Sequence, residues 1–200
     1  MDDTRFGLKH LVSIFLKLAI AVMSVVSLLR GDYVWFIGGA FALFLTLVPT
    51  ILERDFKMEL PLIFDTTITI SIFFHAIGSY HGFYYNVPFY DHFTHFVSAA
   101  TVSLIGVTLL YDLAFHVRIV KLPPLGFGIF TVLFVMSMGL VWEFLEWGFD
   151  LMLGTTLQRG LHDTMLDLLF DTIAGVIVGT ISTLKLSRGE PLVERPLRGE

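Results

Sequence analysis

Long runs of hydrophobic residues recur along the chain, and short polar connections separate them. A helix needs about 20 consecutive apolar residues to cross a hydrocarbon core of about 30 Å. The runs are continuously apolar, whereas membrane-spanning strands alternate apolar and polar positions, so the pattern favours helices. It predicts an all-α fold, a polytopic bundle of six transmembrane helices at residues 11–29, 33–52, 60–79, 93–115, 125–147 and 166–186.

The composition supports this prediction and narrows the chemistry. Of the 200 residues, 55% are hydrophobic and 16% are charged, whereas a soluble domain carries about 25% charged residues. The chain contains no cysteine, so any metal ligand must be an oxygen or an imidazole nitrogen. The net charge of −5 gives no support to nucleic-acid binding. We expect one transmembrane domain over residues 1–186 and a mobile cytoplasmic tail at 187–200.

The positions of lysine and arginine predict the orientation of the bundle. Ten of these residues fall in the termini and connections on one side of the predicted membrane, and two fall on the other. Positively charged connections remain in the cytoplasm. Both termini are therefore expected to be cytoplasmic, which agrees with an even number of spans.

Ionisable residues gather in three motifs at the ends of three apolar runs. Such residues are costly at membrane depth, about 2.5–3.5 kcal/mol each at a helix centre. The motifs are Asp91-x-x-x-His95 with His92 between, Glu143-x-x-Glu146-x-x-x-Asp150, and Asp163-x-x-x-Asp167-x-x-x-Asp171. Residues three or four positions apart share one face of a helix. In the predicted orientation all three motifs lie in the outer half of the bilayer, which predicts a shared site near the extracytoplasmic face.

Several carboxylates in one low-dielectric space cannot all be ionised unaided, so either a divalent cation is bound or the carboxylates share protons. Oxygen and imidazole ligands suit Mg, Mn, Ca, Fe and Zn, and the sequence does not choose among them. We expect a divalent metal ion as cofactor, with proton sharing as the alternative. The expected metal ligands are His95, Glu143, Glu146, Asp167 and Asp171. The expected catalytic residues are Asp91, which would orient His95, and Glu146, a carboxylate that would act as general base.

Some of these residues also have ordinary structural explanations. Asp91 and Asp163 could cap helix N-termini, where a carboxylate accepts backbone hydrogen bonds. His95 could be a core histidine bonded to Asp91. Arg159, the cation nearest the motifs in sequence, could hold an anionic headgroup or could be a solvated loop residue. The sequence leaves these alternatives open.

The order and spacing of the motifs resemble those of a known membrane family. The pattern is Tyr90-Asp91-x-x-x-His95-Phe96, Trp142-Glu143-x-x-Glu146-Trp147 and Asp163-Thr164-x-x-Asp167-x-x-x-Asp171-x-x-x-Gly175. It resembles the YjdF-like inner-membrane family and, more distantly, the VanZ-like proteins, over residues 90–179. Where the VanZ-like pattern usually has lysine, glutamine and asparagine, this chain has His92, Glu146 and Asp171, which makes a bound cation more plausible. The resemblance implies an inner-membrane protein and no particular activity.

Three functions follow from these observations. The first is a metal-dependent enzyme that acts on a lipid or lipid-linked substrate at the outer leaflet. The second is a small cation- or proton-coupled transporter, in which Asp65, Lys17 and Asp112 would supply groups in the inner half; an Asp65–Lys17 pair is the structural alternative. The third is a non-catalytic membrane scaffold. We expect a multi-pass protein of the cell membrane whose surroundings are the lipid bilayer, and the sequence does not predict its oligomeric state.

Overall fold

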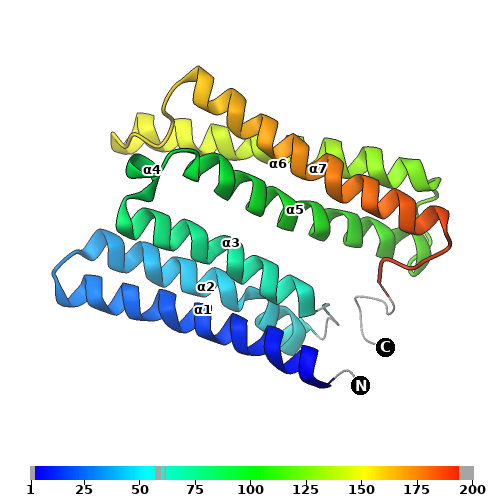
Figure 1. Cartoon of the computed structure of the whole chain (residues 1–200), viewed down its shortest axis with the longest axis horizontal. Coiled ribbons are helices and arrows are strands. Elements are labelled where there is room, and N and C mark those ends of the chain that lie inside the picture. Colours follow the sequence, from blue (N-terminus) through cyan, green and yellow to red (C-terminus); the bar gives the residue numbers. More distant parts are fainter. Residues whose placement is uncertain (1–2, 57–59, 61, 194–200) are drawn as a thin grey trace. The chain divides into compact units, whose positions relative to one another are not determined.

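The computed structural model describes residues 3–56, 60 and 62–193, and within these residues the chain folds into helices without strands. The helices are α1 (Asp3–Leu29), α2 (Tyr33–Phe56), α3 (Leu62–His81), α4 (Phe83–Asn86), α5 (Tyr90–Phe115), α6 (Pro124–Leu153) and α7 (Leu161–Ser187) (Figure 1). The all-α prediction is confirmed for this part of the chain. Half of the predicted mobile tail, residues 194–200, lies outside the described residues.

Within the described residues, five helices are long and apolar enough to cross a membrane: α1, α2, α5, α6 and α7. Helix α3 is not among them, although it is 20 residues long. It carries Asp65 and four hydroxyl residues within its first 10 positions. The chain is therefore a multi-pass helical protein, and the count of six spans stays a prediction.

The helices extend beyond the apolar runs that predict them. Helix α5 begins at Tyr90 instead of residue 93, and α6 continues to Leu153 instead of residue 147. Helix α7 begins at Leu161, five positions before its apolar run. Backbone hydrogen bonding continues through polar positions, whereas hydropathy marks only the length in contact with lipid. All three acidic motifs therefore lie within helices.

The chain divides into two compact units, and the boundary in the sequence falls between Tyr90 and Asp91. In the first unit α1, α2 and α3 pack against one another, and the short α4 follows α3 (Figure 1). A small residue permits the close approach of α1 and α2, because a Cβ atom at Gly39 would lie 2.8 Å from the Cβ of Ser24. Close contact at small residues is the usual packing of membrane helices.

The second unit contains α5, α6 and α7, which run in alternating directions (Figure 1). Its main core consists of Val107, Leu110, Tyr111, Phe127 and Val178. Helices α6 and α7 approach closely at two glycines, since a Cβ at Gly179 would lie 2.8 Å from the carbonyl oxygen of Gly128. The alternating directions bring the start of α5, the end of α6 and the start of α7 to the same end of this unit. These are the segments that carry the acidic motifs.

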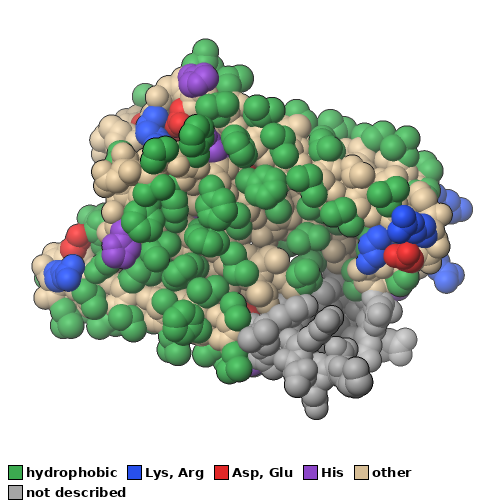
Figure 2. Space-filling view, in the orientation of Figure 1, with side chains coloured by type: hydrophobic (Ala, Val, Ile, Leu, Met, Phe, Trp, Pro, Cys, Tyr) green, Lys and Arg blue, Asp and Glu red, His purple; other side chains and the backbone are tan. Residues whose placement is uncertain are grey.

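Hydrophobic side chains predominate on the visible face, and lysine and arginine side chains gather near helix ends (Figure 2). Large apolar residues are exposed along the described spans, among them Leu133 of α6 at 59% and Ile181 of α7 at 53%. In water such exposure would be unfavourable, but lipid is as apolar as these side chains. The surface therefore agrees with a lipid environment.

Candidate functional site

The buried ionisable residues of the second unit form one connected group. We call Asp91, His92, His95, Glu143, Asp163, Asp167 and Asp171 the acidic cluster, since each lies within 4.8 Å of another member. Five of them are less than 8% exposed, namely His92, His95, Glu143, Asp167 and Asp171. Asp91 and Asp163 are the more accessible members. The convergence of the three motifs, which the sequence predicts, is thus present in this unit.

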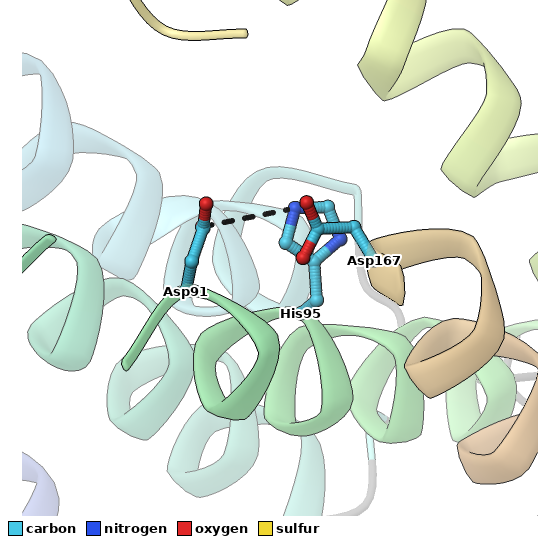
Figure 3. A group of neighbouring side chains, drawn as sticks. All are labelled: Asp91, His95 and Asp167. Carbon is cyan, nitrogen blue, oxygen red and sulfur yellow. Dashed lines mark ion pairs between the residues drawn. The ribbon is translucent and has the colours of Figure 1, made fainter. Parts of the chain in front are cut away.

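Three members meet between α5 and α7. Asp91 and His95 are one turn apart on α5, and Asp167 extends toward them from α7 (Figure 3). One potential ligand atom from each of these three residues lies within 4.8 Å of the other two. Two oxygen ligands on opposite sides of a Ca²⁺ ion are about 4.8 Å apart, and those of Mg²⁺ about 4.2 Å apart. The group has the dimensions of a cation site.

His95 is at the centre of a second set of contacts. Its Nδ1 atom is 3.3 Å from Oδ1 of Asp171, and its Nε2 atom is 4.0 Å from both Asp91 Oδ1 and Glu143 Oε1. The last two separations are too long for hydrogen bonds. Glu143 Oε1 is buried and finds no hydrogen-bond partner among the described residues. A buried acceptor without a partner is uncommon, so this atom calls for an explanation.

A second group of three shares Asp167 with the first. His92 Nδ1 lies 2.7 Å from Asp167 Oδ1, and the His92 ring stacks on Phe170 with the ring centres 5.5 Å apart. Potential ligand atoms of His92, Asp163 and Asp167 lie within 4.8 Å of one another. The stacked ring and the short hydrogen bond fix the orientation of His92. Asp167 therefore stands between two histidines of the same helix.

Arg159 joins the outer members of the two groups. Its Nη2 atom donates a hydrogen bond to Asp91 Oδ2, and its Nε atom lies 3.3 Å from Asp163 Oδ2. Burial disfavours the charged guanidinium, but the negative charges of Asp91 and Asp163 outweigh this and raise the pKa of Arg159 above its usual value. Arg159 is therefore an ion-paired member of the site, not a freely solvated loop residue.

The loop that carries Arg159 is held by Asp150, near the end of α6. Thr155 Oγ1 and the backbone N–H of Leu157 donate to Asp150 Oδ1 at 2.7 and 2.8 Å, and the N–H of Gln158 donates to Oδ2 at 2.9 Å. Gly154 ends α6 with φ of 66°, a left-handed conformation that glycine adopts readily. Asp150 therefore acts as a loop anchor.

A glycine of α6 sets the position of Asp171. A Cβ atom at Gly139 would lie 2.3 Å from Asp171 Oδ2 and 3.3 Å from Leu168 Cδ2. Only a residue without a side chain leaves room for the carboxylate at this place. The carboxylate of Asp171 therefore lies against the backbone of α6 and 3.3 Å from His95 Nδ1, an arrangement that the spacing of the acidic motifs alone does not predict.

Glu146 occupies a different position from the other expected ligands. It is half-buried on α6, one turn after Glu143, and accepts a hydrogen bond from Trp142 Nε1 at 2.9 Å. Neither group of three includes it. The structure thus brings together Asp91, His95 and Asp167 directly, places Glu143 and Asp171 beside His95, and leaves Glu146 at the margin.

Two members of the cluster, His92 and Asp163, are absent from the ligands that the sequence predicts. His92 precedes His95 by three positions, and this spacing puts both imidazoles on one side of a helix. Asp163 lies in the first turn of α7, where a carboxylate also suits the helix dipole. The spacing of the histidines could have identified His92. No sequence signal separates Asp163 from an ordinary N-terminal acid.

The first unit contains its own polar contact between helices. Lys17 Nζ of α1 lies 2.5 Å from Asp65 Oδ1 of α3, and Ser13 Oγ donates a hydrogen bond to Asp65 Oδ2. Both charged side chains are more than four-fifths buried. The expected Asp65–Lys17 pair is therefore present. Each charge has a partner, as a purely structural role requires.

Comparisons with known proteins place the chain among membrane proteins. The model of the family described as "Predicted membrane protein (DUF2238)" matches residues 10–188. A protein of Thermotoga maritima with the description "Uncharacterized protein" is 27% identical over 145 residues, which is 72% of this chain and 70% of that protein. No solved structure matches. The family match is consistent with the YjdF-like resemblance, whereas the VanZ-like resemblance stays an expectation. Since the match covers both units and all three motifs, the chain belongs to the DUF2238 family of predicted membrane proteins.

Proposed function

We propose that this protein binds a divalent cation in the acidic cluster and uses it to act on a lipid or lipid-linked substrate at the outer face of the cell membrane. The observation that carries the proposal is Glu143 Oε1, which is buried, lacks a hydrogen bond to any described residue and lies 4.0 Å from His95 Nε2. An unsatisfied buried acceptor costs about 1–3 kcal/mol, and more when it is charged. A cation between the two atoms would remove this cost.

The distances around His95 support a cation in preference to hydrogen bonding. Asp91 Oδ1 and Glu143 Oε1 are each 4.0 Å from His95 Nε2. Two ligands on opposite sides of one ion, each at about 2.1 Å, are about 4.2 Å apart. Mg²⁺ or Mn²⁺ would therefore need only small side-chain movements to lie between His95 Nε2 and one of these two oxygens.

The residues around the cation have distinct proposed roles. A bound divalent cation would supply a Lewis acid for an ester or phosphoryl group. Asp171 lies 3.3 Å from His95 Nδ1 and would orient the imidazole. Asp91 pairs with Arg159 and would hold the guanidinium at the rim of the cluster. Arg159 suits an anionic headgroup, because its planar donors match phosphate oxygens. Glu146, held by Trp142, remains the proposed general base.

The proposal includes α3 as a sixth span and both termini in the cytoplasm, which would put the acidic cluster near the extracytoplasmic face. The distribution of lysine and arginine among the connections supports this orientation. Because the chain has no cysteine, cysteines introduced one at a time can be labelled to determine the orientation. A cysteine at Thr156 should react with an impermeant reagent on intact cells, and one at Val117 should react only after lysis. The reverse labelling would contradict the orientation.

Cation binding is tested on purified protein in detergent. Chelator-treated protein is equilibrated with Mn²⁺, and bound metal is measured for the unmodified chain and for Glu143→Gln. We expect bound Mn²⁺ and a loss of affinity of at least about tenfold in Glu143→Gln, the lower end of the effect of changing residues around a metal. Asp112→Asn is the matched control, since Asp112 is a buried aspartate of α5 outside the cluster.

The same variant separates metal binding from proton sharing. If Glu143 is a protonated, neutral acid, Glu143→Gln will preserve its shape and leave both stability and Mn²⁺ binding unchanged. That result, or the absence of bound metal in the unmodified chain, would refute the proposal. Loss of binding in Asp112→Asn as well would show that the effect is not specific to the cluster.

A further inference from the structure

The acidic cluster contains two groups of potential ligands that share one residue. The first is Asp91, His95 and Asp167, and the second is His92, Asp163 and Asp167. Each group has one imidazole from α5 and one carboxylate of its own, with Asp167 common to both. A carboxylate has two oxygens and can bind a different cation through each of them.

We propose that the acidic cluster holds two divalent cations bridged by the carboxylate of Asp167. The inference rests on the proposed function and extends it from a single ion to a pair. In paired metal centres the ions lie about 3.5–4 Å apart, and such centres catalyse phosphoryl and peptide hydrolysis. A pair of ions specifies the class of substrate more narrowly than one ion does, since the reacting group must offer oxygens to both.

The geometry of the two histidines supports one ion on each side of Asp167. His92 Nδ1 lies 2.7 Å from Asp167 Oδ1, close to the spacing of about 3.0 Å between adjacent ligands on an ion with bonds of about 2.1 Å. His95 faces the other group, with Glu143 Oε1 at 4.0 Å from its Nε2 atom. Glu143 is 3% exposed, and its Oε1 atom has no hydrogen bond within the described part of the chain. It supplies a further buried ligand for the first ion.

The charge of the site also fits two ions. A histidine must be neutral to bind a metal. With both imidazoles neutral, the charged groups in contact are five carboxylates, Asp91, Glu143, Asp163, Asp167 and Asp171, and the guanidinium of Arg159. They leave four negative charges, which two divalent cations would neutralise. One divalent cation would leave two negative charges in a low-dielectric space, where uncompensated charge is expensive.

Arg159 contacts one carboxylate from each group, Asp91 of the first and Asp163 of the second. Its guanidinium therefore spans the same two groups that the ions would occupy. Two bound cations would compensate the charge of these carboxylates and weaken their ion pairs with Arg159. The N–H donors of Arg159 would then be available to a phosphate-bearing ligand next to the two ions.

The test is the stoichiometry and magnetic coupling of Mn²⁺ bound to the full chain in detergent, measured by metal analysis and electron paramagnetic resonance. We expect two Mn²⁺ per chain with an exchange-coupled signal. Asp163→Asn should bind one Mn²⁺ with the uncoupled six-line signal, and Asp112→Asn should bind two. Asp163 is preferred for substitution because it is one of the more accessible members of the cluster. The second variant is His92→Gln. The unfolding temperature of each variant verifies that it folds.

The outcomes distinguish this inference from the proposed function. One Mn²⁺ in the unmodified chain would overturn the ion pair and leave the single-ion proposal intact, whereas no bound Mn²⁺ would overturn both. Two uncoupled ions would overturn the bridge at Asp167. Two coupled ions in both Asp163→Asn and His92→Gln would overturn the assignment of the second group.

Discussion

The substitution Gly139→Ala tests how closely α6 positions the acidic cluster. An added Cβ would lie 2.3 Å from Asp171 Oδ2, about 1.1 Å short of ordinary contact at 3.4 Å. If Asp171 moves away from His95 by that distance, its 3.3 Å contact with His95 Nδ1 is lost. Gly148→Ala is the matched control on the same helix, because a Cβ there would meet nothing within 4 Å.

The expected magnitude follows from three opposing terms. Replacing glycine by alanine within a helix favours folding by about 0.8–1.0 kcal/mol. Overpacking costs about 1–3 kcal/mol, and loss of a hydrogen bond to a charged group costs about 1.5–3 kcal/mol. Gly139→Ala should therefore lower the free energy of unfolding by about 1.5–5 kcal/mol, whereas Gly148→Ala should leave it unchanged or raise it by up to about 1 kcal/mol.

The assay is denaturant unfolding in detergent, together with the Mn²⁺ affinity of each variant. Gly139→Ala should also weaken Mn²⁺ binding, since Asp171 no longer supports His95. Combining Gly139→Ala with Asp171→Ala removes the clash, so the two effects should be less than additive. The reasoning would be refuted if the Gly139→Ala variant had the same free energy of unfolding and the same Mn²⁺ affinity as the Gly148→Ala variant. Strict additivity of the double variant would show that Asp171 is not the residue displaced.

Three further predictions concern packing and loops. Lys17→Met or Asp65→Asn alone should lower the free energy of unfolding by up to about 3–5 kcal/mol, and a Lys17→Met/Asp65→Leu double variant should recover most of this loss. If the double variant lost as much free energy of unfolding as the single variants, the two charges would not compensate each other. Gly179→Leu should lower the unfolding temperature, because its Cβ would meet a backbone carbonyl of α6, and Gly148→Leu should not. Asp150→Ala removes three hydrogen bonds to the following loop, so protease should cleave that loop faster; an unchanged cleavage rate would exclude the anchor.

Much of the fold is predictable because membrane helices are encoded locally. The length of each apolar run predicts a span, and spacings of three and four predict which residues share a helix face. The prediction is least accurate at helix ends. Hydropathy describes contact with lipid, whereas a helix continues through polar residues such as Asp163 as long as its backbone is hydrogen-bonded.

The sequence by itself determined that the chain is a multi-pass helical protein and that three acidic motifs lie at one end of the last three long helices. Both features depend on local pattern and on the alternating direction of successive helices. Only the tertiary structure decided which side chains meet. It pairs His92 with Asp167, leaves Glu143 Oε1 without a hydrogen bond among the described residues, and places Asp171 against Gly139. These contacts depend on the rotation and axial offset of packed helices, which close approach at small residues sets and which no single helix encodes.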